Sequence, residues 1–110
     1  MNDNGIAISD ILDMHQALTV HPNADKHGSG LAFALDVLRL IERNKDLHLS
    51  LGSFSFITDP HQVEVNDNVI SIAGIDIDVP KIGGGTDGEY TFPMIGIDGD
   101  QVVPLRLRAA

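Results

Sequence analysis

The stretch VEVNDNVISIAGIDIDV, residues 63–79, decides the fold because its alternation of apolar and polar residues changes phase twice. Period-two alternation is typical of strands with one buried face. Tight turns at Asp67-Asn68 and at Ala73-Gly74 restore a common phase and predict three short antiparallel strands. One face of these strands is then wholly aliphatic and consists of Val63, Val65, Ile70, Ile72, Ile75, Ile77 and Val79. The agreement of register across the strands supports both turns together.

The preceding stretch LHLSLGSFSFI, residues 47–57, shows the same change of phase. Its leucines occupy odd positions and its phenylalanines occupy even positions, so a straight strand would place them on opposite faces. A two-residue turn at Gly52-Ser53 would pair Leu51 with Phe54 and bring both sets onto one face. A bulge at Gly52 within one continuous strand is the alternative, and it has the same effect.

The end of the chain predicts two further strands, on either side of a turn at residues 98–101. Pro93 and Pro104 fall inside these strands, and because proline cannot donate a ladder hydrogen bond, they indicate edge strands or bulges. The segment 80–90, which includes Gly83–Gly85, is predicted to be a loop of about ten residues, and a loop of this length is either functional or mobile.

The first half of the chain predicts two helices. Residues 7–18 repeat apolar side chains at helical spacing, with Ser9 as the expected N-cap. Residues 30–45 carry a wider apolar stripe, which favours packing against a sheet, and Asp36 is expected on the exposed side. The chain is therefore predicted to form one α+β domain, residues 1–110, in which two N-terminal helices pack on a meandering, mainly antiparallel sheet of five or six short strands.

The net charge of −9 is concentrated in the second half of the chain, where residues 57–100 contain nine acids and a single base, Lys81. A field of this sign repels nucleic-acid phosphates and anionic lipids, so neither a nucleic acid nor a membrane is an expected partner. It favours a basic protein partner. The alternative is that the acids only keep one face solvated.

The absence of cysteine excludes a disulfide scaffold, thiol catalysis and cysteine-ligated zinc, and it agrees with a reducing compartment. The first residues lack the basic and apolar regions of a signal peptide, and the longest apolar run, LAFAL, is far too short to span a membrane. We therefore expect a soluble cytoplasmic domain that uses no cofactor.

Acidic residues form the candidate binding site. In the predicted meander, Asp76 and Asp78 point away from the aliphatic face, on the same side as Ser71 and Glu64. A flat strand face lacks the burial and the convergent ligands that a metal or acid–base site needs, so an interaction surface is the favoured interpretation. With two acids from the glycine-rich loop, the predicted set is Glu64, Asp76, Asp78, Asp87 and Glu89.

The histidines offer an alternative site. His21 and His27 share one loop with Asp25, and His61 lies in a second loop. Two histidines and a carboxylate can ligate zinc, although the spacing of six residues between His21 and His27 is not the i, i+4 pairing of a helical zinc site. Gly83–Gly85 is followed by acids and a predicted strand, not by a helix with a basic residue, which disfavours nucleotide binding.

Three hypotheses follow from these patterns. The first is a small non-enzymatic domain, of the inhibitor, immunity-protein or mobile-element accessory type, that binds a protein through its acidic sheet face. The second is a small enzyme or a ligand- or metal-binding protein, with a pocket between the second helix and the sheet that is served by the loop histidines. The third is a homo-oligomer that assembles through its edge strands.

Overall fold

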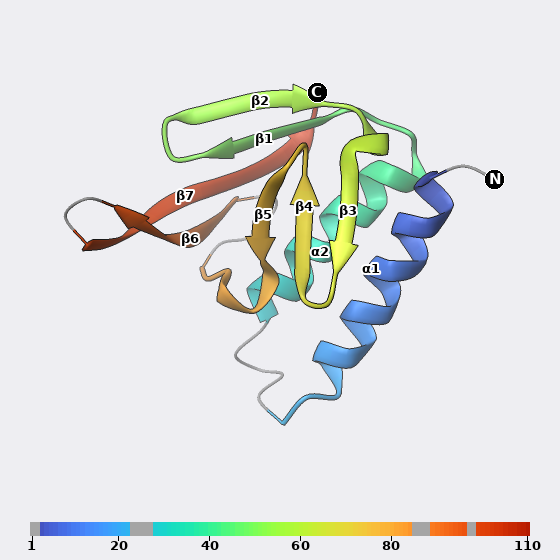
Figure 1. The fold of residues 1–110 in the computed structure, drawn as a ribbon, viewed down its shortest axis with the longest axis horizontal. Coiled ribbons are helices and arrows are strands. Elements are labelled where there is room, and N and C mark those ends of the chain that lie inside the picture. Colours follow the sequence, from blue (N-terminus) through green and yellow to red (C-terminus); the bar gives the residue numbers. More distant parts are fainter. Residues whose placement is uncertain (1–2, 23–27, 85–88, 97–98) are drawn as a thin grey trace.

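The computed structural model describes residues 3–22, 28–84, 89–96 and 99–110, and it shows two helices packed with two antiparallel sheets (Figure 1). The helices are α1 (Asp3–Thr19) and α2 (Gly28–Glu42). A four-stranded sheet has the order β2-β1-β7-β6, and a three-stranded sheet has the order β3-β4-β5. The remaining elements are β1 (Leu47–Leu51), β2 (Phe54–Thr58), η2 (Pro60–Gln62), β3 (Val63–Asn66), β4 (Val69–Ile72), β5 (Ile75–Asp78), η3 (Val79–Lys81), β6 (Glu89–Gly96) and β7 (Gly99–Ala109). The predicted α+β class is confirmed, and the strands are divided between the two sheets.

The three-stranded sheet has the predicted register. β3 pairs with β4 so that Val65 lies opposite Ile70, and β4 pairs with β5 so that Ile72 lies opposite Ile75. The predicted aliphatic face is turned inward, with Val65 and Ile75 partly buried and the other members fully buried: Val63, Ile70, Ile72, Ile77 and Val79. Both turns in the opening stretch are therefore confirmed.

β1 and β2 form a hairpin, which confirms the turn at Gly52-Ser53 and not the bulge. Leu51 lies opposite Phe54, as the turn predicted. Gly52 has a φ of 64°, a left-handed conformation that glycine adopts without steric cost. On its other side, β1 pairs along its whole length with β7.

The two strand prolines lie in different positions. Pro93 is in β6, which is an edge strand as predicted. Thr91 exchanges two backbone hydrogen bonds of 2.9 Å with Gly83 on the outer side of β6. Because backbone groups two residues apart in a strand point the same way, the missing N–H of Pro93 also faces outward. Pro104 lies in β7, which is an inner strand, so the predicted edge or bulge is wrong there. The carbonyl of Pro104 accepts a hydrogen bond of 2.8 Å from the N–H of Gly52, the first residue after β1. Pro104 therefore lies beside the turn that follows β1, and its missing N–H interrupts no pairing within β1.

α1 begins at Asp3, so the prediction of Ser9 as its N-cap is wrong. The earlier start adds a turn that carries Ala7, which extends the buried stripe of Ile11, Met14 and Leu18 towards the N-terminus. Within the described residues, neither helix is long and apolar enough to cross a membrane.

α2 ends in a Schellman motif that is built on Asn44. Asn44 has a φ of 53°, and its N–H donates to the carbonyl of Ile41 at 3.0 Å. The N–H of Lys45 donates to the carbonyl of Leu40 at 2.9 Å. These two bonds satisfy carbonyl groups at the helix end and direct the chain into β1.

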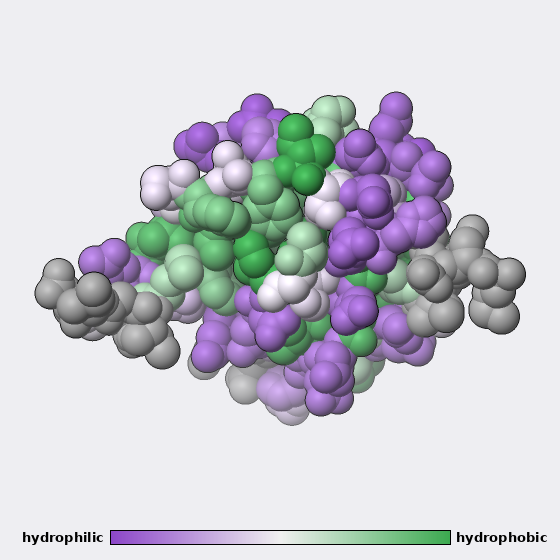
Figure 2. All heavy atoms as spheres, turned by 45° about the horizontal axis from the view of Figure 1, so that its top comes forward, coloured by the Kyte–Doolittle hydropathy of each residue, from purple (hydrophilic) through white to green (hydrophobic). Residues whose placement is uncertain are grey.

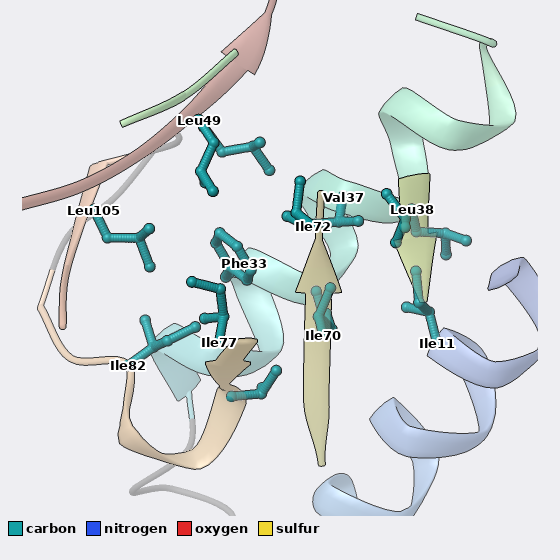
Figure 3. Packing of buried hydrophobic residues seen from close by; sticks show 14 of the residues in the cluster. Ile11, Phe33, Val37, Leu38, Leu49, Ile70, Ile72, Ile77, Ile82 and Leu105 are labelled. Atoms are coloured by element: carbon teal, nitrogen blue, oxygen red, sulfur yellow. The ribbon is translucent and has the colours of Figure 1, made fainter. Parts of the chain in front are cut away.

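The two sheets share one hydrophobic core, and α2 lies at its centre. Figure 3 shows side chains of α2 between those of the four-stranded sheet and those of the three-stranded sheet. The side chains that meet there are Phe33, Val37, Leu49, Leu105, Ile70, Ile72 and Ile77. The space between α2 and the sheets, where a pocket was one of the predictions, is thus occupied by packed core residues.

Two close contacts fix the position of α2. A Cβ added at Gly30 would overlap the carbonyl oxygen of Val79, so the helix approaches η3 as only glycine permits. On the other side, the hydroxyl of Tyr90 donates to Asp36 Oδ2 at 2.5 Å, and its ring packs edge-on to Phe33 with a centroid distance of 5.7 Å. The prediction that Asp36 lies on the exposed side is wrong, because its side chain is only 24% exposed and binds a buried tyrosine.

Candidate functional site

The outer face of the three-stranded sheet carries three of the predicted acids. The register aligns Glu64, Ser71 and Asp76 in one row across β3, β4 and β5, and strand alternation turns this row away from the core. Glu64 and Asp76 are exposed. Asp78 is half-buried at the end of β5, where the Nζ of Lys81 lies 3.7 Å from its Oδ2. We call Glu64, Asp76 and Asp78 the outer acidic face.

The spacing of this face decides what chemistry it can do. Glu64 and Asp76 lie on strands that are separated by β4, which places them about 10 Å apart at the usual interstrand spacing. Two carboxylates at that distance share neither a metal ion nor a proton. Both side chains are also surrounded by water, so the face attracts cationic groups without forming a catalytic dyad.

Of the other two predicted acids, the one that the structure describes, Glu89, does not belong to this face. Glu89 lies on β6 of the four-stranded sheet, opposite Arg106, with 4.0 Å between Glu89 Oε1 and Arg106 Nε. These two residues line a shallow pocket of about 340 Å³ on the β6–β7 ribbon. Asp87 lies outside the described residues. The described members of the predicted set are therefore divided between the two sheets.

A second group of acids, which was not among the predicted site residues, lies at the β3–β4 turn of the same sheet. An open cleft of about 470 Å³ separates α1 from the β3–β4 turn, and it is lined by Asp10, Asp13 and Asp67. We call these three residues the acidic cleft. Asp10 and Asp13 are three residues apart on one helix, a spacing that places them on the same side and that could have indicated the pair from sequence.

The two loop histidines that the structure describes, His21 and His61, are not gathered into a site. His21 follows the C-terminal end of α1, whereas His61 lies in η2, which Figure 1 shows beside the N-terminal end of α1. Asp59 accepts the backbone N–H of His61 at 2.8 Å, so this histidine has a local structural partner. Asp25 and His27 lie outside the described residues. Among the residues that the structure describes, no group of three histidines, cysteines or acids is placed to hold a metal ion.

The four-stranded sheet presents apolar side chains where its hairpins extend beyond the helices. The register places Phe54, Phe56, Met94 and Val103 on the helix-facing side, where Phe54 and Met94 are exposed and the rings of Phe54 and Phe56 are 5.5 Å apart. Figure 2 shows hydrophobic side chains over the middle and left of this view, on the side of these hairpins, and hydrophilic ones over α1 on the right. In this view, apolar side chains thus gather on the side of the hairpins of the four-stranded sheet.

Comparison of the chain with protein-family models, with curated proteins and with solved structures finds no match.

Proposed function

We propose that this protein is a non-enzymatic binding domain that engages a basic protein through the outer acidic face and the adjoining acidic cleft. The observation that carries the proposal is the exposed row of Glu64 and Asp76, neither of which takes part in the ion pairs of the described residues. Asp67 lies in the turn that joins β3 to β4, so the cleft continues from the face.

The physical role of such a surface is to guide a cationic partner into register. Exposed carboxylates lose little hydration until they are contacted, and their summed field accelerates association and discriminates against acidic competitors. The aliphatic side of the same strands is rigidly packed against the helices, so the acids are held on a firm support. We place this activity in the cytoplasm, which agrees with a chain that has no cysteine.

A charge-reversal experiment tests the proposal. The protein carrying Glu64→Lys and Asp76→Lys is compared with the wild type in pull-downs from a lysate of the native source at about 0.15 M salt, near physiological ionic strength. We expect the variant to lose the basic proteins that the wild type retains. The matched control carries Glu42→Lys and Asp46→Lys, which make the same change in charge at exposed positions at the end of α2. Recovery of the same partners by the wild type and both variants would show that the acidic face does not bind.

A further inference from the structure

β2 is an apolar strand at an open edge of the four-stranded sheet. Phe54 and Ile57 are 56% and 62% exposed, and strand alternation places them on opposite faces of the sheet. In Figure 1, β2 forms the upper boundary of the molecule, and no described element lies beyond it. An open edge of this kind is a template for pairing with another strand.

The other outer strands of the described sheets are protected in ways that β2 is not. β3 lies beside α1 and carries Glu64, and β5 carries Asp76 and Asp78. β6 contains Pro93, and its outer side is bridged to Gly83. Charge, proline and coverage are the means by which sheets avoid edge-to-edge association. The five residues of β2, FSFIT, include no charged residue and no proline.

The backbone groups of Ser55 and Ile57 face the open edge. The N–H of Gly52 donates to the carbonyl of Pro104, so the backbone N–H and C=O groups of even-numbered residues at this end of the β1 segment point towards β7. The backbone groups of the odd-numbered residues point towards β2. The β1–β2 register pairs odd-numbered residues of β1 with even-numbered residues of β2. The even-numbered residues of β2 are therefore bonded to β1, and Ser55 and Ile57 direct their N–H and C=O groups outward.

We propose that two copies of this protein form a dimer by antiparallel pairing of their β2 strands about a two-fold axis at Phe56. Ser55 of one copy then pairs with Ile57 of the other, and Phe54 lies opposite Thr58. Each of the outward-facing groups finds a partner, which gives roughly four backbone hydrogen bonds across the axis. The four-stranded sheet becomes continuous through both copies, in the isologous arrangement of a two-fold dimer.

A second copy fits this edge because the pairing is self-complementary. Phe56 meets Phe56 at the axis, and aromatic cross-strand pairs stabilise antiparallel sheets. With a net charge of −9, copies repel one another, but β2 itself is uncharged and the outer acidic face lies on the other sheet. The first acid beyond β2, Asp59, would lie opposite Ser53 of the other copy, so no two carboxylates are opposed. This inference does not depend on the proposed function, since it uses a different sheet.

The mass of the protein in solution tests the dimer. We expect sedimentation velocity between about 10 μM and about 1 mM to show a species of twice the chain mass of 11.8 kDa that increases with concentration. Ile57→Lys should abolish it, because a lysine on each β2 brings like charges to the pairing edge. The control Val102→Lys introduces the same side chain at an exposed position of β7 and should dimerise as the wild type does. A wild type that stays monomeric over this range, or an Ile57→Lys variant that dimerises equally, would overturn the proposal.

Hydrogen exchange of the wild type gives a second test that requires no variant to fold. The amides of Ser55 and Ile57 should exchange at least about tenfold more slowly at the higher concentration, because they are bonded only in the dimer. The amides of Phe54 and Phe56 face β1 and should be protected at both concentrations. If the exchange of Ser55 and Ile57 is independent of concentration, the β2 edge is not the contact.

Discussion

The two sheets of this protein share a core but differ in how their outer parts meet water. The three-stranded sheet turns its aliphatic face onto the helices and presents acids on the other face. The four-stranded sheet leaves an uncharged apolar strand at its edge. Charge on the outer face of the first sheet and its absence from β2 are the features behind the two proposed contacts, one with a cationic partner and one with an identical strand.

The largest expected effect tests whether the two sheets form one cooperative unit. Phe33→Ala removes a fully buried side chain that lies between them, and we expect a loss of about 3–5 kcal/mol in the free energy of unfolding. Urea unfolding followed by circular dichroism should still show a single transition. Phe54→Ala, at an exposed position, is the matched control and should cost about 1 kcal/mol or less. Two separate transitions would mean that the sheets do not share a core.

The next effect concerns the junction between α2 and the end of the three-stranded sheet. Gly30→Ala places a methyl group against the Val79 carbonyl, and since backbone atoms must move, we expect a loss of about 2–3 kcal/mol. The control Gly28→Ala has open space around its Cβ and should be neutral or slightly stabilising. Thermal unfolding of the two variants compares them directly, and equal stabilities would contradict the close approach.

A smaller effect is expected where α2 meets the four-stranded sheet. Tyr90→Phe keeps the ring but removes the hydroxyl that donates to Asp36, and we expect a loss of about 1–2 kcal/mol, since the carboxylate retains some contact with water. Asp36→Asn keeps an acceptor oxygen and should cost less. Denaturant titrations of both variants measure the difference, and a neutral Tyr90→Phe would show that the hydrogen bond adds no stability.

The smallest effect compares a turn of each sheet. Ala73 adopts a φ of 52° in the turn between β4 and β5, a conformation that asparagine tolerates better, so Ala73→Asn should stabilise the protein by about 0.5–1 kcal/mol. Gly52→Ala makes the opposite change in the β1–β2 turn and should destabilise by about 1 kcal/mol, because a φ of 64° is strained for a residue with a Cβ. The Cβ itself would meet Val103 only at an ordinary contact distance, so no clash adds to this loss. Melting temperatures that move in the same direction would contradict this account.

The sequence predicted the local pairings because side-chain alternation and turn residues act between neighbours in the chain. The turns at Gly52-Ser53 and Ala73-Gly74 are set by a change of phase within a few residues. The outer acidic face followed from the same alternation, so Glu64 and Asp76 could be placed on one side before the structure was known.

Pairings between distant segments were not predicted, because alternation carries no information about which hairpins become neighbours. β1 pairs with β7, and this pairing places Glu89 on a different sheet from Glu64 and Asp76 and makes Pro104 an inner residue. The link between Tyr90 and Asp36 joins residues 54 positions apart, and helical periodicity alone placed Asp36 in solvent. The open edge of β2 became visible only when the strand order was known.

The position of β7 also bears on the order in which the protein folds. The β1–β2 hairpin, the β3–β4–β5 meander and the β6–β7 ribbon each form from adjacent segments and close short loops. The β1–β7 pairing joins residues 47–51 to residues 105–109 and closes a much longer loop than any of these hairpins, so we expect it to form last. Until that pairing forms, the β1–β2 hairpin has two open edges, one on β2 and one on β1. A chain delayed at this stage would expose apolar strands, and correct folding would compete with aggregation.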